Sequence, residues 1–262
     1  MRHAGWLLLA VGLLTACQSA PPPSLVPTPA PVISLAVDLD LSDYHAQLSQ
    51  LDSPIEETEF RYGAPQPTPA LLADLDARQI ALAVTVYQPT GSAYTVTPLA
   101  ATAVAMMVHP SNPVVTLSAA QVRQIFTGQV TDWAEVGGPA GPILVLSREA
   151  GSATRQWFDA VVLGGLPPTP LALVAPAGHS MVATVAETPN AIGYALLTDV
   201  TPAVKLLSID GVPPAMRSPY PYALPVVALT LAEPDGALRR WLAFTQNLPL
   251  ENLPPGLQPF AP

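Results

Sequence analysis

Charged residues, lysine and cysteine are all scarce in this chain of 262 residues. Only 11% of the residues are charged, the net charge is −9, and Lys205 is the single lysine. A chain so short of cations is not built to neutralise a phosphate backbone, which excludes a nucleic-acid partner. A small anion is still an allowed ligand, because a buried anion site works through local dipoles and hydrogen bonds rather than through net charge.

Cys17 is the only cysteine, so a disulfide framework within the chain is excluded. It follows residues 4–16, an apolar run of 13 residues that is too short to cross a bilayer as a helix. The sequence Leu14-Thr15-Ala16-Cys17 looks like a bacterial lipobox. We therefore expect residues 1–16 to be a signal peptide, Cys17 to carry a lipid, and the Pro-rich residues 17–31 to form an extended tether. A plain signal peptide followed by a chance cysteine is the alternative.

Helical patterns and short apolar strands alternate along the remaining chain, which predicts an α/β fold with mixed sheets. The clearest strands are expected at residues 32–37, 80–87, 104–108, 142–146, 171–174, 191–195, 205–209 and 224–231. The clearest helices are expected at residues 68–76, 118–127, 154–163, 180–187 and 236–246. The first of these helices is expected to have Thr68 as its N-cap and Pro69 at its first helical position.

Residues 146–155, with the sequence LSREAGSATR, connect a buried strand to a helix through a short turn that contains glycine. This arrangement leaves backbone N–H groups at the start of the helix without partners. Ser152 and Thr154 add hydroxyl donors, and Arg148 and Arg155 add guanidinium groups that suit oxyanions. The segment therefore predicts a cradle for a small anion. The alternative is a capped helix whose serine and arginine side chains face solvent.

Two other constellations of polar residues are weaker. Ser152 with His179 as its base would be a nucleophile, but the G-x-S-x-G turn is missing. Asp38, Asp40 and Asp43 are spaced like calcium ligands, but the glycine and the distal glutamate of an EF-hand loop are missing, and a solvated loop has the same pattern. We expect no metal and no cofactor.

The order of motifs resembles the phosphate-type (PstS-like) periplasmic solute-binding proteins, which are the binding subunits of ABC phosphate importers. The resemblance is strongest over residues 117–158. There LSAAQV, IFTG, TDW, VGG, and Arg148 followed by GSATR at residues 151–155, occur in the family's order. It continues through AIGY at 191–194 and IDGV at 209–212, and covers about 150 residues from Pro98 to Trp241.

This resemblance implies a two-lobed periplasmic-binding-protein-like fold of type 2, with the anion held in a hinged cleft. Residues 32–105 and 205–262 would form lobe 1, residues 106–197 lobe 2, and residues 198–204 the return crossover. The residues that match the family's oxyanion site are Arg148, Gly151, Ser152, Ala153 and Thr154. Ala153 stands where the family usually has glycine, and its methyl group would narrow the approach of a ligand.

The first lobe departs from the family in two places. The family's Gly-Ser/Thr turn, which supplies donors, is missing after Val37, and Asp38 and Asp40 stand near that place. The family's acid, which accepts the proton of hydrogen phosphate, is missing from residues 79–83. We therefore expect discrimination between phosphate and sulfate of less than about a hundredfold. Four acids would restore it if the fold brings one to the anion: Asp38, Asp40, Asp74 and Asp76.

These observations predict a non-enzymatic, monomeric solute-binding protein outside the cytoplasm, held at the membrane by its lipid alone. It would capture a small oxyanion, phosphate above all, for an ABC transporter permease. The alternative is a surface lipoprotein of the same fold with an altered or lost ligand, acting as a sensor or an interaction module, and a hydrolase comes third.

Overall fold

The computed structural model describes residues 30–51, 55–217 and 219–260. The predicted signal peptide, Cys17 and most of the predicted tether lie outside the described residues. Among the described residues, no helix is both long enough and apolar enough to span a bilayer.

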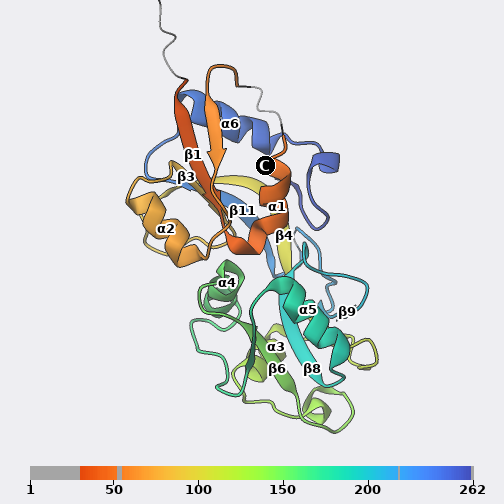
Figure 1. Cartoon of the computed structure of the whole chain (residues 1–262). Coiled ribbons are helices and arrows are strands. Elements are labelled where there is room, and N and C mark those ends of the chain that lie inside the picture. The colour runs from red at the N-terminus through yellow and green to blue at the C-terminus, as the bar shows by residue number, and fades with distance from the viewer. Residues whose placement is uncertain (1–29, 52–54, 218, 261–262) are drawn as a thin grey trace, which may run out of the picture. The chain divides into compact units, whose positions relative to one another are not determined.

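One long strand, β4 (Thr95–Val108), joins the two halves of the main sheet (Figure 1). Its first half pairs antiparallel with β11 (Ala223–Thr230), and its second half pairs antiparallel with β8 (Ala191–Leu196). Eight strands follow one another in the order β2-β1-β3-β11-β4-β8-β6-β7, and β9 and β12 also pair with β4. The other bounds are β1 (Val32–Val37), β2 (Glu59–Tyr62), β3 (Leu82–Thr85), β6 (Leu144–Arg148), β7 (Leu173–Ala175), β9 (Lys205–Leu206) and β12 (Gln258–Pro259). A separate two-stranded sheet contains β5 (Thr116–Leu117) and β10 (Ser208–Ile209).

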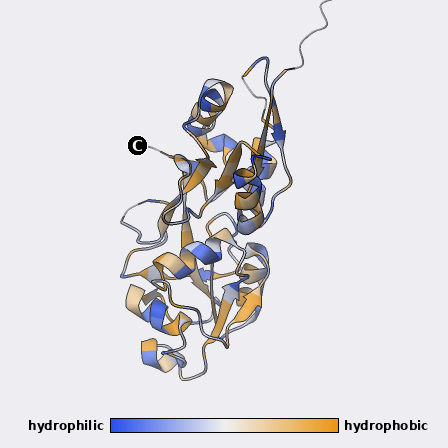
Figure 2. Ribbon diagram, turned by 90° about the vertical axis from the view of Figure 1, so that its left-hand side faces the viewer, coloured by the Kyte–Doolittle hydropathy of each residue, from blue (hydrophilic) through white to orange (hydrophobic). Residues whose placement is uncertain are grey.

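The half of the sheet around β1, β3 and β11 is covered by helices on both faces. Successive side chains of a strand point to opposite faces, so each strand contributes to two apolar clusters. Ala36 and Ala83 pack with Leu71 and Leu75 of α2 (Thr68–Asp76) on one face. The other face packs against α1 (Ser42–Leu48) and α6 (Gly236–Gln246). Several strands are predominantly apolar, whereas the helices carry both polar and apolar residues (Figure 2).

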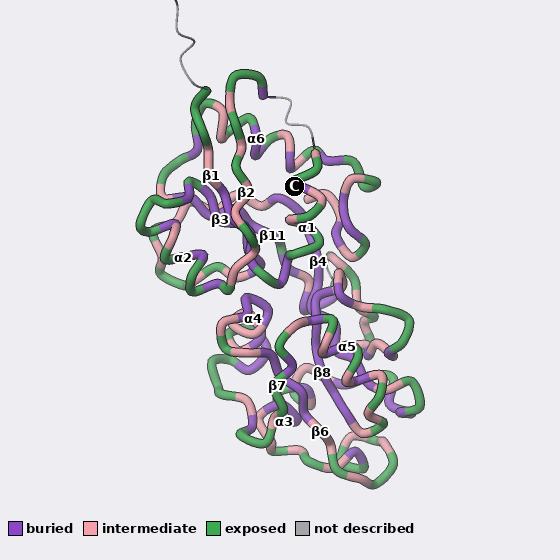
Figure 3. The backbone as a smooth tube through the Cα atoms, viewed as in Figure 1, coloured by how far each residue is buried: buried purple, intermediate pink, exposed green. Residues whose placement is uncertain are grey.

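The other half repeats this arrangement around β8, which is buried along its whole length (Figure 3). Ile192, Tyr194 and Leu196 belong to the apolar cluster that includes residues of α3 (Ala119–Phe126) and α4 (Ala153–Val161). Ala191 and Ala195 pack on the opposite face against α5 (Gly178–Glu187). Three short 3-10 helices complete the described elements: η1 (Leu39–Leu41), η2 (Trp133–Val136) and η3 (Leu250–Asn252).

The mixed α/β fold is confirmed, and several details differ from the sequence-based expectation. The single strand expected at residues 205–209 is divided into β9, which pairs with β4, and β10, which pairs with β5. Strand β4 begins at Thr95 rather than at residue 104, because β11 supplies a partner for a stretch that contains Pro98. Thr68 does not cap α2 through its side chain, because its hydroxyl donates to Asp38 instead. The described residues from Pro31 onward group into one compact unit, and the predicted lobe boundary at 105/106 falls inside β4. The lobe limits stay a prediction.

Candidate functional site

The predicted strand, turn and helix start are present between β6 and α4. β6 ends at Arg148, and α4 begins at Ala153 with Ser152 as its N-cap. The Ser152 Oγ accepts a hydrogen bond of 3.1 Å from the backbone N–H of Arg155. The backbone N–H of Thr154 is one of the donors that an α-helix leaves free in its first turn. This segment, residues 148–155, is called the cradle below.

The guanidinium of Arg148 is buried in the cradle, and its side chain is only 1% exposed. Nε and Nη2 donate to the two carboxylate oxygens of Glu149 at 3.2 Å and 3.1 Å. The hydroxyl of Tyr194 accepts a hydrogen bond from the Arg148 backbone N–H at 3.3 Å, and the Tyr194 ring stacks on Phe158. Nη1 of Arg148 is buried and has no hydrogen-bond partner.

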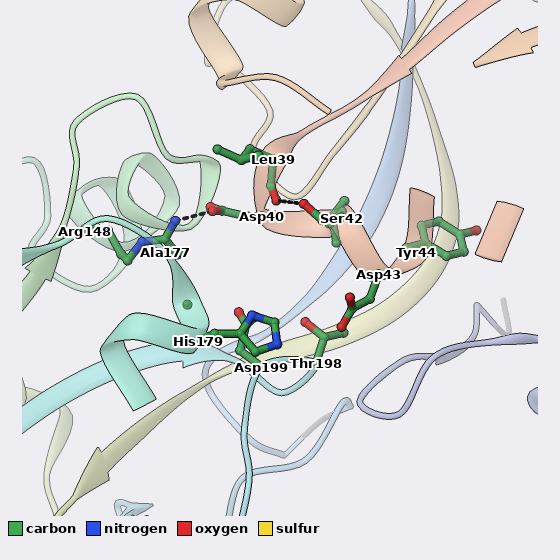
Figure 4. Close-up of a pocket in the computed structure, with 12 residues that line it drawn as sticks. Leu39, Asp40, Ser42, Asp43, Tyr44, Arg148, Ala177, His179, Thr198 and Asp199 are labelled. Atoms are coloured by element: carbon green, nitrogen blue, oxygen red, sulfur yellow. Dashed lines mark hydrogen bonds and ion pairs between the residues drawn. The ribbon is translucent and has the colours of Figure 1, made fainter. Parts of the chain in front are cut away.

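A carboxylate from the other half of the sheet reaches into the cradle. Asp40 lies in η1, directly after β1, and its side chain is 1% exposed. Its Oδ1 accepts from Nη2 of Arg148 at 2.5 Å. Its Oδ2 accepts from the Ser152 Oγ at 2.6 Å and from the Thr154 backbone N–H at 2.8 Å. Figure 4 shows Asp40 and Arg148 pointing toward one another.

The charges in the cradle keep Asp40 ionised. Burial by itself would raise the pKa of this carboxyl, but the charge of Arg148 and the hydrogen bonds from Ser152 and Thr154 lower it below its usual value. The Thr154 hydroxyl adds to this effect, although it has no partner in hydrogen-bonding geometry. The donors of the cradle therefore stabilise a negative charge that water does not reach.

A second buried acid, Asp38, lies beside Asp40 and behaves in the opposite way. Burial, and then the charge of Asp40, raise its pKa to about 7. Its Oδ2 accepts from the Thr68 hydroxyl at 2.6 Å, and its Oδ1 accepts from the Asp40 backbone N–H at 3.0 Å. The other two acids considered from the sequence bind elsewhere, Asp74 to Gln66 and Asp76 to Tyr94.

Of the five residues predicted to hold an oxyanion, Arg148, Ser152 and Thr154 meet at one carboxylate. Gly151 contributes its carbonyl oxygen, which accepts from the Thr68 backbone N–H at 3.1 Å. The methyl group of Ala153 belongs to the apolar core. The expectation that this methyl group narrows the approach of a ligand is therefore wrong.

Arg155, which the sequence grouped with the anion donors, has a different role. Its Nε donates to both oxygens of Asp159 at 2.8 Å and 2.7 Å, and its Nη1 donates to the Ser147 Oγ and the Arg148 carbonyl oxygen. Arg155 therefore stabilises the turn through Ser147 and the Arg148 carbonyl oxygen. Its charge is paired with Asp159, one helical turn further along α4.

A cavity of about 140 Å³ lies next to the Asp40–Arg148 pair. Its lining includes Asp43, His179 and Asp199 (Figure 4). His179 Nδ1 lies 3.1 Å from Asp199 Oδ1, and the pKa of Asp199 is raised to about 6, chiefly by burial. The Ser152 hydroxyl bonds to Asp40 and Arg155, so its described contacts do not include His179 as a base. Within residues 30–51, 55–217 and 219–260, no group of histidine, cysteine or acidic side chains is arranged to hold a metal ion.

The mixed sheet with helices on both of its faces matches the two-lobed α/β fold of the periplasmic binding proteins, as comparison with known proteins shows. A family model described as "PBP superfamily domain" matches residues 58–245, and the chain belongs to this family. The phosphate-binding protein PstS of Bacillus subtilis (strain 168) is 29% identical over 154 residues, which are 57% of this chain and 51% of that protein. This chain therefore aligns with about half the length of that relative.

Solved structures share the fold at lower identity. An ABC-type phosphate transport receptor from Vibrio cholerae superposes with a TM-score of 0.67 and is 23% identical, covering 82% of this chain and 94% of its own. A putative phosphate ABC transporter substrate-binding protein from Clostridium perfringens, crystallised with bound phosphate, has a TM-score of 0.71 and 22% identity, with coverages of 82% and 93%. The family match begins at residue 58 and so excludes the segment that carries Asp38 and Asp40.

Proposed function

We propose that this protein is a solute-binding protein that captures a small oxyanion, phosphate above all, and delivers it to the permease of an ABC importer. Membership of the periplasmic-binding-protein family and the similarity to PstS of Bacillus subtilis support this proposal. The protein binds its ligand without transforming it, and it acts outside the cytoplasm.

The observation that carries the proposal is the set of donors that converge on one buried carboxylate. A guanidinium, a hydroxyl and a backbone N–H at a helix N-terminus all point to the Asp40 oxygens. Such donors bind oxyanions because hydrogen bonds to an ionised acceptor are short and strong when water is excluded. The set also offers more donors than Asp40 uses, since the buried Nη1 of Arg148 has no partner. A tetrahedral oxyanion has more acceptor oxygens than a carboxylate, and so suits this surplus.

A thermal-shift panel on the purified protein tests the proposal. The panel contains phosphate, sulfate, molybdate, tungstate and small carboxylates at millimolar concentration. A ligand at about a hundred times its dissociation constant stabilises the fold by about 2.7 kcal/mol, so Tm rises measurably. If no oxyanion raises Tm, the proposed function is wrong.

Calorimetric titrations of the native protein with phosphate and with sulfate at one pH measure the selectivity between these two anions. We expect a ratio below about a hundredfold, because residues 79–83 supply no acid to accept the proton of hydrogen phosphate. A strong preference for phosphate would instead identify an acid that the fold has brought to the ligand. Asp38 and Asp40 are then the first residues to replace, because both are buried near the cradle.

The second candidate function is a lipoprotein of the same fold whose ligand is altered or lost, acting as a sensor or an interaction module. The position of Asp40 favours it, because an ionised side chain bonds to the donors that an external anion needs. A panel in which every oxyanion leaves Tm unchanged would support this candidate.

We propose a lipid anchor at Cys17, on the lipobox-like sequence that precedes it. Replacing Cys17 with serine is expected to abolish acylation and to release the protein from the membrane fraction. Immunoblots of membrane and soluble fractions, with the native protein beside the variant, measure this directly. An unacylated variant that still sediments with membranes contradicts the anchor.

A further inference from the structure

The donors that would hold an external oxyanion are already bonded to Asp40. We propose that Asp40 is an internal ligand of the cradle, which an incoming oxyanion must displace, so that this residue sets the affinity of the site. The inference rests on the proposed function, because it concerns the same cradle.

The geometry makes the two anions exclusive. Both oxygens of Asp40 are used, one on Arg148 and the other on Ser152 and Thr154. An external oxyanion that bonds to these atoms has to take the same positions. Two negative charges a few ångströms apart in a site that excludes water repel strongly, so the cradle holds one anion at a time.

The chain places Asp40 so that its side chain can leave. It belongs to η1, a 3-10 helix of three residues that connects β1 to α1. The cavity of about 140 Å³ lies directly beside the Asp40–Arg148 pair and is lined by both residues. For displacement, the Asp40 side chain has to turn toward this cavity, which would free the Ser152 and Thr154 donors without unpairing a strand. It would also bring the carboxylate toward two other acids that line the same cavity, Asp43 and Asp199.

Arg148 remains paired when Asp40 leaves. Its guanidinium keeps the two hydrogen bonds to Glu149, and Arg155 still braces the turn through Asp159 and the Arg148 carbonyl oxygen. The cradle is therefore preorganised for an anion with or without Asp40. If Asp40 were only a structural partner of Arg148, removing it would destabilise the fold without changing anion binding. If Asp40 is an internal ligand, only the fraction of molecules in which it has left the cradle can bind an external oxyanion, and the apparent affinity for that oxyanion is reduced by this fraction.

The test is a calorimetric titration of inorganic phosphate into the native protein and into Asp40→Ala. We expect the variant to bind phosphate at least ten times more tightly, and to bind acetate, which replaces the missing carboxylate, where the native protein does not. Asp76→Ala is the matched control, because it removes the same charge from an exposed carboxylate that accepts a hydrogen bond from the Tyr94 hydroxyl and not from the cradle donors. The control is expected to bind phosphate with native affinity. Asp40→Asn, which keeps the shape of the side chain but not its charge, serves if Asp40→Ala does not fold.

The outcomes separate the two claims. If the native protein binds phosphate and a folded Asp40 variant binds it no more tightly, the internal-ligand inference is wrong and the proposed function stands. If the native protein binds no oxyanion, the proposed function fails, and the inference fails with it when both folded Asp40 variants also bind none. If Asp76→Ala gains as much phosphate affinity as Asp40→Ala, the gain comes from the change in net charge alone. This result would also contradict the inference.

Discussion

The cradle and the segment that faces it are held together in different ways. Most polar groups of the cradle have partners close in sequence: Ser152 with Arg155, Arg155 with Asp159, and Arg148 with Glu149. The facing segment depends on distant partners, since Asp38 bonds to Thr68 across 30 positions and Asp40 bonds to Arg148 across 108. Contacts between residues close in sequence therefore shape the cradle, whereas the Asp40 carboxylate reaches it only when the chain is folded.

The two regions also differ in how they shift the pKa of a buried acid. The cradle gathers donors around one ionised acid, and lowers the pKa of Asp40. The facing segment holds a second acid in a place where burial raises the pKa to about 7. The pKa values of two acids that are two residues apart are therefore shifted in opposite directions, because only Asp40 accepts hydrogen bonds from the cradle donors.

The largest expected effect comes from removing the cation of the cradle. Arg148→Ala leaves the Asp40 carboxylate buried without its counter-charge, which costs about 3–5 kcal/mol of unfolding free energy, and anion binding is lost. Urea denaturation and phosphate titration measure the two effects. Arg61→Ala is the control, because Arg61 and Glu59 form an exposed pair, worth about 1 kcal/mol or less. A variant at Arg148 that keeps native anion binding contradicts the cradle as the site.

A smaller effect concerns the pH dependence that Asp38 imposes. An acid whose pKa is raised in the folded state stabilises the protein below its unfolded pKa, and this contribution is lost as pH rises through about 7. We expect the native protein to lose at most about 4 kcal/mol between about pH 4 and pH 8 through this group, and Asp38→Asn to lose correspondingly less.

Unfolding curves at several pH values check this difference. Asp199, whose pKa is raised to about 6, contributes in the same window, but it contributes equally to both proteins. Identical slopes for the native protein and Asp38→Asn would mean that Asp38 titrates normally.

The smallest effect tests the link between Asp38 and α2. Thr68→Val keeps the shape of the side chain but removes the hydroxyl that donates to Asp38, which costs about 1–2 kcal/mol. Helix content by circular dichroism is expected to stay unchanged, because Thr68 does not cap α2 through its side chain. Thr68→Ser, which keeps the hydroxyl, serves as the control, and a loss of helix in Thr68→Val alone would show that Thr68 does cap it.

Much of the fold is predictable from the sequence because its signals are local. The capping box of Ser118 and Gln121 marks the start of α3, and the apolar spacing of residues 236–246 matches the bounds of α6. Strand β4 is an exception. Its first half contains Pro98 and is a strand because β11 pairs with it, which is a contact between distant parts of the chain.

The site is predictable only on one side. The turn between β6 and α4 carries its donors in a short stretch, so Arg148, Ser152 and Thr154 stand out in the sequence. The sequence also shows two acids where donors are expected, at Asp38 and Asp40, but nothing near them indicates which one reaches the cradle. That depends on how β1 and η1 pack opposite α4, which no local pattern specifies.

A crystal structure of the native protein grown with saturating phosphate tests the central claim most directly. We predict an anion within hydrogen-bonding distance of the Arg148 guanidinium, the Ser152 hydroxyl and the Thr154 backbone N–H, with the Asp40 side chain turned away from these donors. A structure in which Asp40 keeps all three bonds, and phosphate lies elsewhere or is not bound, would contradict the account.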